Sequence, residues 1–271
     1  MPTLDAFGYN LVYNLLSFTV ATMGAATLFF FFSPRVNRKY RPAMVVTGLV
    51  TAIAFYHYWQ IRDSFSAAYS REAAEGVATY VFTGKPFNDF YRYADWLLTV
   101  PLLMVELIAV MALSKQESKK YLVILVPMVV LMIVLRYPGE NANSTGRSAG
   151  PIWGWFVASM IPFVVILATL FTKLTGAINK QPEGVRGLFN FARIVVLITW
   201  SFYPIAYVIG ALGMGEEGIG AGAFIGLQVG YTIADITAKA GFGVVIYMIA
   251  RRKSEIEGFD DLAVQATPAA A

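Results

Sequence analysis

The stretch RYADWLLTVPLLMVEL, residues 92–107, decides the reading of this chain because it places charged residues inside an apolar run. Most of its residues are apolar or aromatic, which is typical of a segment that crosses a bilayer as a helix. An ionised side chain at membrane depth carries a substantial free-energy cost. Arg92, Asp95 and Glu106 therefore predict that this segment uses charge inside a membrane.

The composition of the whole chain agrees with this interpretation. Of its 271 residues, 57% are hydrophobic and only 14% are charged, whereas soluble domains carry about a quarter charged residues. The absence of cysteine excludes disulfides and thiolate catalysis, and a single histidine excludes a multi-histidine metal site, so we expect no metal. No basic residue precedes the first apolar run, so we expect that helix to be retained rather than cleaved as a signal peptide.

Seven apolar segments are long enough to span a bilayer, which takes about 20 residues in a helix. They predict an all-α membrane protein, a bundle of seven transmembrane helices in one domain over residues 1–252. Residues 253–271 are expected to form a short, flexible cytoplasmic tail. The predicted spans are residues 7–32, 43–66, 88–113, 119–137, 151–174, 187–212 and 219–250.

The distribution of lysine and arginine between the loops predicts the orientation of the bundle. One side holds Arg35, Arg38, Lys39, Arg41, Lys115, Lys119, Lys120, Lys173, Lys180, Arg186, Arg193, Arg251, Arg252 and Lys253. The other side holds Arg62, Arg71, Lys85, Arg92, Arg136 and Arg147. The richer side is expected in the cytoplasm, with the C-terminus, and the N-terminus outside. The net charge of +4 is thus a sign of topology, and we expect no nucleic-acid partner.

The charged residues of the third span share one face of the helix. Arg92, Asp95, Thr99, Leu103 and Glu106 are spaced three or four residues apart, which aligns them in a stripe. With a rise of about 1.5 Å per residue, Asp95 and Glu106 are roughly 16 Å apart along the axis. Two carboxylates at different depths, with a hydroxyl between them, are typical of stations for a proton.

The seventh span contains Asp235 and Lys239 one helical turn apart. Lys239 is roughly 18 Å from the basic end of the span, too far for its ammonium to reach the interface. A desolvated lysine can condense with an aldehyde to form a Schiff base, and Asp235 would balance the protonated product. Each of these charged groups also has a simpler interpretation. Asp235 and Lys239 could form a plain intrahelical ion pair, and Glu106 could be a protonated, hydrogen-bonded carboxyl group in the core. Arg92 could simply mark the membrane interface.

Aromatic side chains accompany the lone buried lysine. Aromatic residues at helical spacing usually pack in a core, but beside a single buried lysine they favour a slot for a flat, conjugated, apolar ligand. The residues with this role are Trp96, Phe156, Ser159, Trp200, Tyr203 and Tyr207.

Three motifs together resemble the microbial rhodopsins over nearly the whole chain: residues 92–107, WSFYP at 200–204 and DITAK at 235–239. The pattern is similar to the bacterial outward proton pumps of the proteorhodopsin and xanthorhodopsin kind. The resemblance implies all-trans retinal, bound covalently to Lys239 as a protonated Schiff base. It implies a light-driven ion transporter, not an enzyme, in the cell membrane of a prokaryote, with protons and lipid as partners. We also expect a homo-oligomer.

The resemblance assigns a role to each of the charged residues in the spans. Asp95 would be the primary counterion and proton acceptor, and Asp235 the second counterion. Arg92 would be the partner of Asp235 on the outward side, and Glu106 the cytoplasmic proton donor. Thr99 completes an Asp–Thr–Glu pattern typical of proton pumps, since sodium pumps of the family place an aspartate at that position.

Further expectations come from the same resemblance. Taken alone, His57 would be a histidine packed among aromatic residues or at the interface. The resemblance implies that it contacts Asp95, so that the two groups titrate as a coupled pair. Leu103 predicts a green-absorbing pigment. Phe156 falls where carotenoid-binding relatives carry a glycine, so we expect no carotenoid antenna.

Two questions stay open at this stage. Proton release past Arg92 is expected to involve Glu140, Glu216 or Glu217, unless these three are only solvated loop residues. Two rival functions use the same residues. One is a sensory photoreceptor that signals to a separate transducer, against which Glu106 argues, and the other is a retinal-free transporter with Lys239 and the aspartates as ion sites.

Overall fold

The computed structural model describes the whole chain except residues 33–35, 75–76, 145–148, 213, 216–217 and 260–271. Arg35, Arg147, Glu216, Glu217 and most of the predicted tail lie outside the described residues.

The seven predicted spans are confirmed as seven long apolar helical segments in the described part of the chain. The first four are single helices, α1 to α4. The fifth comprises α5, a π-helical turn η2 and α6, the sixth is α7, and the seventh comprises α8, a π-helical turn η3 and α9. Their bounds are Ala6–Phe32 (α1), Arg41–Ala68 (α2), Phe90–Met111 (α3), Lys115–Ser144 (α4), Ala149–Ala168 (α5), Thr169–Lys173 (η2), Leu174–Asn179 (α6), Glu183–Leu212 (α7), Ala221–Ile236 (α8), Thr237–Gly241 (η3) and Phe242–Ile256 (α9).

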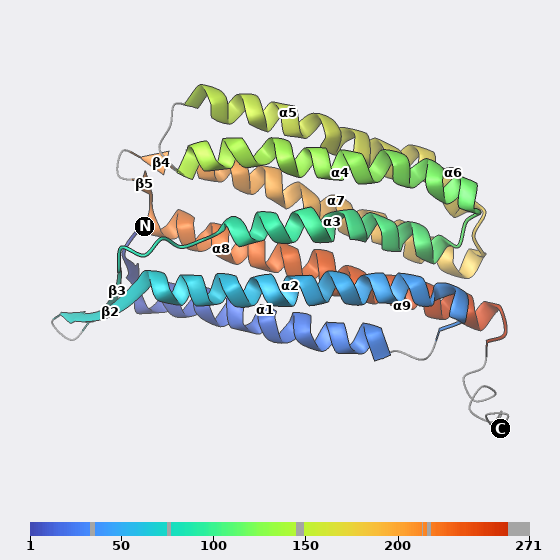
Figure 1. Ribbon diagram of the computed structural model, residues 1–271, viewed down its shortest axis with the longest axis horizontal. Coiled ribbons are helices and arrows are strands. Elements are labelled where there is room, and N and C mark those ends of the chain that lie inside the picture. Colours follow the sequence, from blue (N-terminus) through green and yellow to red (C-terminus); the bar gives the residue numbers. More distant parts are fainter. Residues whose placement is uncertain (33–35, 75–76, 145–148, 213, 216–217, 260–271) are drawn as a thin grey trace.

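The helices lie side by side along the long axis of the molecule (Figure 1). Each of the first five packs against the next, and α8 closes the bundle by packing on both α1 and α7. Buried side chains of α2, α3, α4, α5, α7 and α9 meet in one continuous apolar core. The third span, which carries the charged stripe, is thereby surrounded by other helices, and its polar face is kept from lipid.

The ends of the bundle differ. At the end that carries the N-terminus, the polar segment between α2 and α3 forms a hairpin of β2 (Tyr69–Ala74) and β3 (Val77–Phe82), with Tyr69 opposite Phe82 (Figure 1). Strand β1 (Leu4–Asp5) pairs with the other edge of β3. A second two-stranded ribbon, β4 (Met214–Gly215) and β5 (Gly218–Ile219), lies between α7 and α8. The sequence analysis expected only loops here, because its search was for segments long enough to span a bilayer.

Local sequence explains where the helices begin and bend. The Ser114 hydroxyl accepts a hydrogen bond from the backbone N–H of Glu117 and donates one to its carboxylate, a side-chain N-cap at the start of α4. Pro101 in α3 and Pro204 in α7 each leave a backbone carbonyl without its usual partner, which packed neighbouring helices tolerate. A short turn, η1 (Arg38–Tyr40), precedes α2.

The seventh span widens into a π-helical turn at Lys239 itself. Such turns are rare and occur often at functional sites. Lys239 is 1% exposed, so the turn places its side chain inside the bundle, away from lipid.

A glycine in the last two turns of α4 permits close packing against α5 and α7. A Cβ atom at Gly139 would lie 2.2 Å from the hydroxyl oxygen of Tyr207 and 2.9 Å from the Cβ of Trp155. The Tyr207 hydroxyl can therefore reach past α4 and donate to the carbonyl of Ile152 at 2.7 Å.

Candidate functional site

The centre of the site is an ion cluster around Lys239. The Lys239 Nζ donates hydrogen bonds to Asp95 Oδ2 on α3 and to Asp235 Oδ2 on α8, the second at 2.8 Å. All three side chains are almost completely buried. With every group ionised, the cluster carries one positive and two negative charges, so its net charge is −1.

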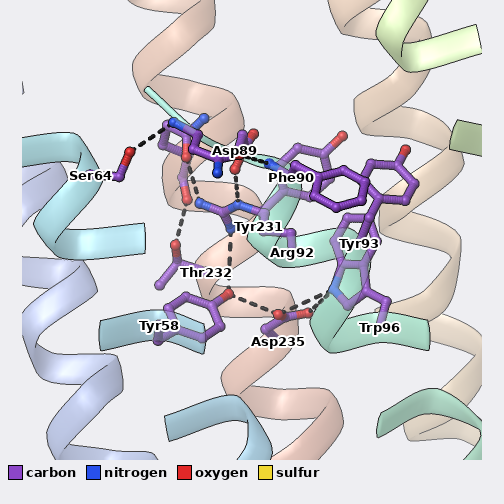
Figure 2. Close-up of polar contacts among 12 residues, drawn as sticks. Tyr58, Ser64, Asp89, Phe90, Arg92, Tyr93, Trp96, Tyr231, Thr232 and Asp235 are labelled. Carbon is purple, nitrogen blue, oxygen red and sulfur yellow. Dashed lines mark hydrogen bonds and ion pairs between the residues drawn. The ribbon is translucent and has the colours of Figure 1, made fainter. Parts of the chain in front are cut away.

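The two aspartates have unequal hydrogen-bond environments. Asp235 accepts hydrogen bonds from the Tyr58 hydroxyl at 2.8 Å and from the Trp96 indole N–H at 3.1 Å (Figure 2). It also accepts one from the Tyr203 hydroxyl. Asp95 Oδ1 is buried and has no hydrogen-bond partner among the described residues. Because hydrogen bonds to a carboxylate stabilise its charged form, these donors favour the anion of Asp235 more than that of Asp95.

His57 lies beside Asp95 without a direct hydrogen bond to it. Its Nδ1 is 4.0 Å from Asp95 Oδ1 and 2.9 Å from the carbonyl oxygen of Ile53 on the preceding turn. His57 and Asp95 are therefore neighbours, as expected, but no hydrogen bond joins them among the described residues. The hydroxyl of Thr99 also points elsewhere, because it donates to the backbone carbonyl of Asp95 at 2.8 Å rather than to its carboxylate.

Arg92 is buried toward the hairpin end of the bundle, and its contacts differ from those expected. Its guanidinium donates to Asp89 Oδ1 and to Gln228 Oε1, both at 2.5 Å, and lies 3.4 Å from the Tyr58 hydroxyl oxygen. Within the described residues, it reaches Asp235 only through Tyr58 (Figure 2). Asp89 lies three residues before Arg92, so the aspartate can meet the guanidinium over one helical turn.

Glu106 lies on α3 beyond Asp95, toward the end of the bundle where α9 ends. Its side chain is completely buried, and neither carboxyl oxygen has a hydrogen-bond partner among the described residues. A carboxyl group in such surroundings is most stable with its proton attached, because ionisation would leave a desolvated, unpaired charge.

An elongated, mostly apolar pocket extends from Lys239 between α3, α4, α5 and α7. It brings together all eight residues that the sequence analysis assigned to cofactor binding. They are Trp96, Leu103, Phe156, Ser159, Trp200, Tyr203, Tyr207 and Lys239. Eight further residues line the same pocket, namely Val100, Met132, Ile133, Arg136, Met160, Phe163, Pro204 and Ala238. A lysine at the end of an apolar, aromatic-lined slot fits a covalently bound polyene such as retinal.

Glu140 corrects one expectation. The sequence analysis placed it in a polar loop after the fourth span, but it lies within α4, where Arg136 Nε donates to Glu140 Oε2 at 3.1 Å. Arg136 also lies 5.3 Å from the centre of the Tyr207 ring, an aromatic contact that helps to keep a buried cation. Tyr93 and Tyr231, the latter at 3.3 Å, donate to Glu140, which is therefore not a simple solvated residue.

Several site residues escaped the sequence analysis. Tyr58 and Asp89 belong to the polar network (Figure 2), and Gln228 accepts a hydrogen bond from Arg92. Gln228 lies seven residues before Asp235, on the same helical face, so its spacing was the available signal. Asp89 lies three residues before Arg92, so its spacing was a similar signal, whereas Tyr58 is one of several aromatic residues in the second span.

Comparisons with known proteins agree with this geometry. The model of the family described as bacteriorhodopsin-like protein matches residues 11–253. The green-light absorbing proteorhodopsin of Gamma-proteobacterium EBAC31A08 is 31% identical over 261 residues, covering 94% of this chain and 94% of the relative. The blue-light absorbing proteorhodopsin of Gamma-proteobacterium Hot 75m4 is 30% identical over 243 residues, covering 88% of this chain and 86% of the relative.

Solved structures match over almost the entire chain. Xanthorhodopsin, described as a light-driven ion pump with dual chromophore, superposes with a TM-score of 0.86 at 48% identity. A thermophilic rhodopsin superposes with a TM-score of 0.87 at 43% identity. Each comparison covers 96% of this chain and 100% of the other.

Proposed function

Because the chain belongs to the bacteriorhodopsin-like family of microbial rhodopsins, we propose that it is a light-driven outward proton pump. In this proposal all-trans retinal is bound to Lys239 as a protonated Schiff base, Asp95 accepts the proton and Glu106 supplies the next one. Family membership supports the pigment, and the relatives named as proteorhodopsins support the transported species.

One observation carries the assignment of Asp95: two buried carboxylates contact the same lysine nitrogen but differ in their other partners. Asp235 is stabilised by three uncharged donors, whereas Asp95 Oδ1 has none among the described residues. A proton that leaves the Lys239 nitrogen is therefore expected to move to Asp95, while Asp235 stays charged.

Retinal at Lys239 would supply light absorption and a change of shape that moves the Lys239 nitrogen relative to Asp95. The residues of this chain provide the rest. Trp96, Trp200 and Tyr203 confine the slot, and the apolar core excludes water. Glu106 keeps its proton in dry surroundings until the lysine nitrogen has lost its own, and then returns one from the opposite side.

The direction of pumping depends on the orientation of the bundle. The excess of lysine and arginine in the loops at the α9 end supports a cytoplasmic location for that end. Glu106 then lies on the cytoplasmic side of Lys239, and Arg92 lies on the outward side. Protons would enter past Glu106 and leave past Arg92, across the cell membrane of a prokaryote.

The colour and the antenna are also part of the proposal. Leu103 presents an apolar surface to the slot, which supports a green-absorbing pigment. Phe156 lines the slot and stacks on Tyr207, with their ring centres 5.3 Å apart. We infer that this aromatic pair closes the side of the slot on α5, so that no carotenoid reaches the pigment.

A light-induced pH trace on cells that express the protein tests the function. With retinal supplied, illumination should acidify the unbuffered medium, and a protonophore should abolish the effect. A coloured protein that bleaches with hydroxylamine under light but moves no protons would instead indicate a sensor. A colourless protein would indicate the retinal-free transporter.

A further inference from the structure

Asp89 is an unassigned carboxylate at the start of α3, one helical turn before Arg92. Its Oδ1 accepts a hydrogen bond from Arg92 Nε at 2.5 Å (Figure 2). Another nitrogen of the guanidinium, Nη2, donates to Gln228. No hydrogen bond joins Arg92 to Asp95 or to Asp235 among the described residues. The cation is thus held toward the hairpin end of the bundle, away from the acceptor.

Asp89 faces a cavity of about 300 Å³ between α3 and α4. The other carboxylate that lines this cavity, Glu140, is bound by Arg136, Tyr93 and Tyr231. The charge of Glu140 is balanced by its own arginine. Asp89 is therefore the carboxylate of this cavity that pairs directly with Arg92.

Arg92 lies between two sources of negative charge. On the inner side, the cluster of Lys239, Asp95 and Asp235 carries a net charge of −1 and reaches Arg92 through the Tyr58 hydroxyl. On the outer side is Asp89, in direct contact. Asp89 and Asp95 are separated by six residues of α3, roughly 9 Å along its axis. Removing the outer charge leaves only the inner attraction.

Building on the proposed proton pump, we propose that Asp89 is a positioning residue that retracts Arg92 from Asp95 and so makes Asp95 a better proton acceptor. Without the charge of Asp89, the guanidinium moves toward Tyr58 and the inner aspartates. A closer cation stabilises the Asp95 carboxylate, so more acid is needed to protonate it. The other titratable groups near Asp95 among the described residues are unchanged in this comparison, namely His57, Lys239, Asp235 and the phenols of Tyr58 and Tyr203.

Spectral titration of the dark pigment tests this inference, because protonation of Asp95 changes the colour. Asp89→Asn removes the charge but keeps a residue suited to a helix N-cap. The midpoint of the colour transition should fall by about one pH unit, the lower end of the shift that an opposite charge produces when it comes close to a carboxylate. Asp89→Ser, also a good N-cap, should behave alike, and Asp89→Glu should restore the original midpoint.

The matched control is Asp63→Asn. It removes a carboxylate at the same end of the bundle whose partner is Arg62, at 2.8 Å. The midpoint should stay where it is in the unaltered protein, because Asp63 has no contact with Arg92 among the described residues. An equal shift in Asp63→Asn would overturn the proposal, since any nearby charge would then suffice.

A double-mutant cycle separates an effect through Arg92 from a direct field of Asp89 on Asp95. In an Arg92→Gln background, Asp89→Asn should shift the midpoint by less than half as much as in the unaltered background. Equal shifts in both backgrounds, or no shift with Arg92 present, would contradict the proposal. A protein that binds retinal without any colour transition would instead refute the assignment of Asp95, and with it the proposed function.

Discussion

At the scale of single residues, the unequal environments of two aspartates support the proposal that the Lys239 nitrogen gives its proton to Asp95 rather than to Asp235. Lys239 contacts both carboxylates, yet only Asp235 has a full set of further donors within the described residues. In the proposed pump, the hydroxyls of Tyr58 and Tyr203 stabilise the charged form of Asp235, and they do not themselves transfer the proton of the Lys239 nitrogen. If this difference sets the path of the proton, replacing Asp95 and replacing Asp235 should have different effects.

Asp95→Asn should abolish pumping, lowering the initial rate of light-induced acidification by a factor of about 10² or more, since an amide accepts no proton there. The dark pigment should also lose its acid-to-alkaline colour transition, which visible titration measures. Asp235→Asn serves as the comparison and should keep a transition, at a different pH. A colour transition that persists in Asp95→Asn would assign the acceptor to another group.

Glu106→Gln should leave the first proton transfer intact and slow the return of a proton to the Lys239 nitrogen. Flash spectroscopy should find this recovery slowed by a factor on the order of 10², the usual contribution of a positioned acid. A small membrane-permeable weak acid in the medium should restore much of the rate, because it can carry the missing proton inward. Unchanged recovery would remove Glu106 from the pathway.

At the scale of elements, the end of α3 near Glu106 is fastened by a buried lysine from α9. The Lys253 Nζ donates to the carbonyls of Val110 and Met111, at 3.1 and 2.8 Å, and to Gln181 Oε1 at 2.7 Å. The last carbonyls of a helix have no partners within it, so Lys253 satisfies groups that burial would otherwise leave unpaired.

Lys253→Met should destabilise the folded protein by about 2–4 kcal/mol, because charged hydrogen bonds are lost and buried carbonyls lose their partner. Thermal unfolding of the pigment, followed by its loss of colour, measures the effect. Arg252→Met is the neighbouring control, since Arg252 is exposed and pairs only with Glu255 in the described part of the chain. Similar losses in both variants would argue against this fastening role.

At the scale of the whole molecule, the sequence predicted the seven spans correctly because each is a long apolar run between polar clusters. It also identified the slot, since lysine, aspartates and aromatics recur at helical spacing. It missed contacts that depend on how helices face one another, such as Tyr58 with Asp235 and Asp89 with Arg92. The position of Arg136 shows the same limit, because its burial depends on a partner and on rings from α3 and α7.

The orientation of the bundle can be measured directly because the chain has no cysteine. Lys85→Cys, in the segment between β3 and α3, should react in intact cells with a thiol reagent that does not cross membranes. Lys180→Cys, between α6 and α7, should react only after the cells are opened, although this position is also exposed. The reverse pattern would invert the bundle and the direction of pumping.

The most direct test of the account concerns the nitrogen of Lys239. Reduction of the retinal-bound pigment with borohydride, followed by mass spectrometry of its peptides, locates the attached group. The account predicts a retinyl group on the peptide containing Lys239, and no visible pigment in Lys239→Ala. Attachment at another lysine, such as the buried Lys253, or a normal pigment in Lys239→Ala would contradict it.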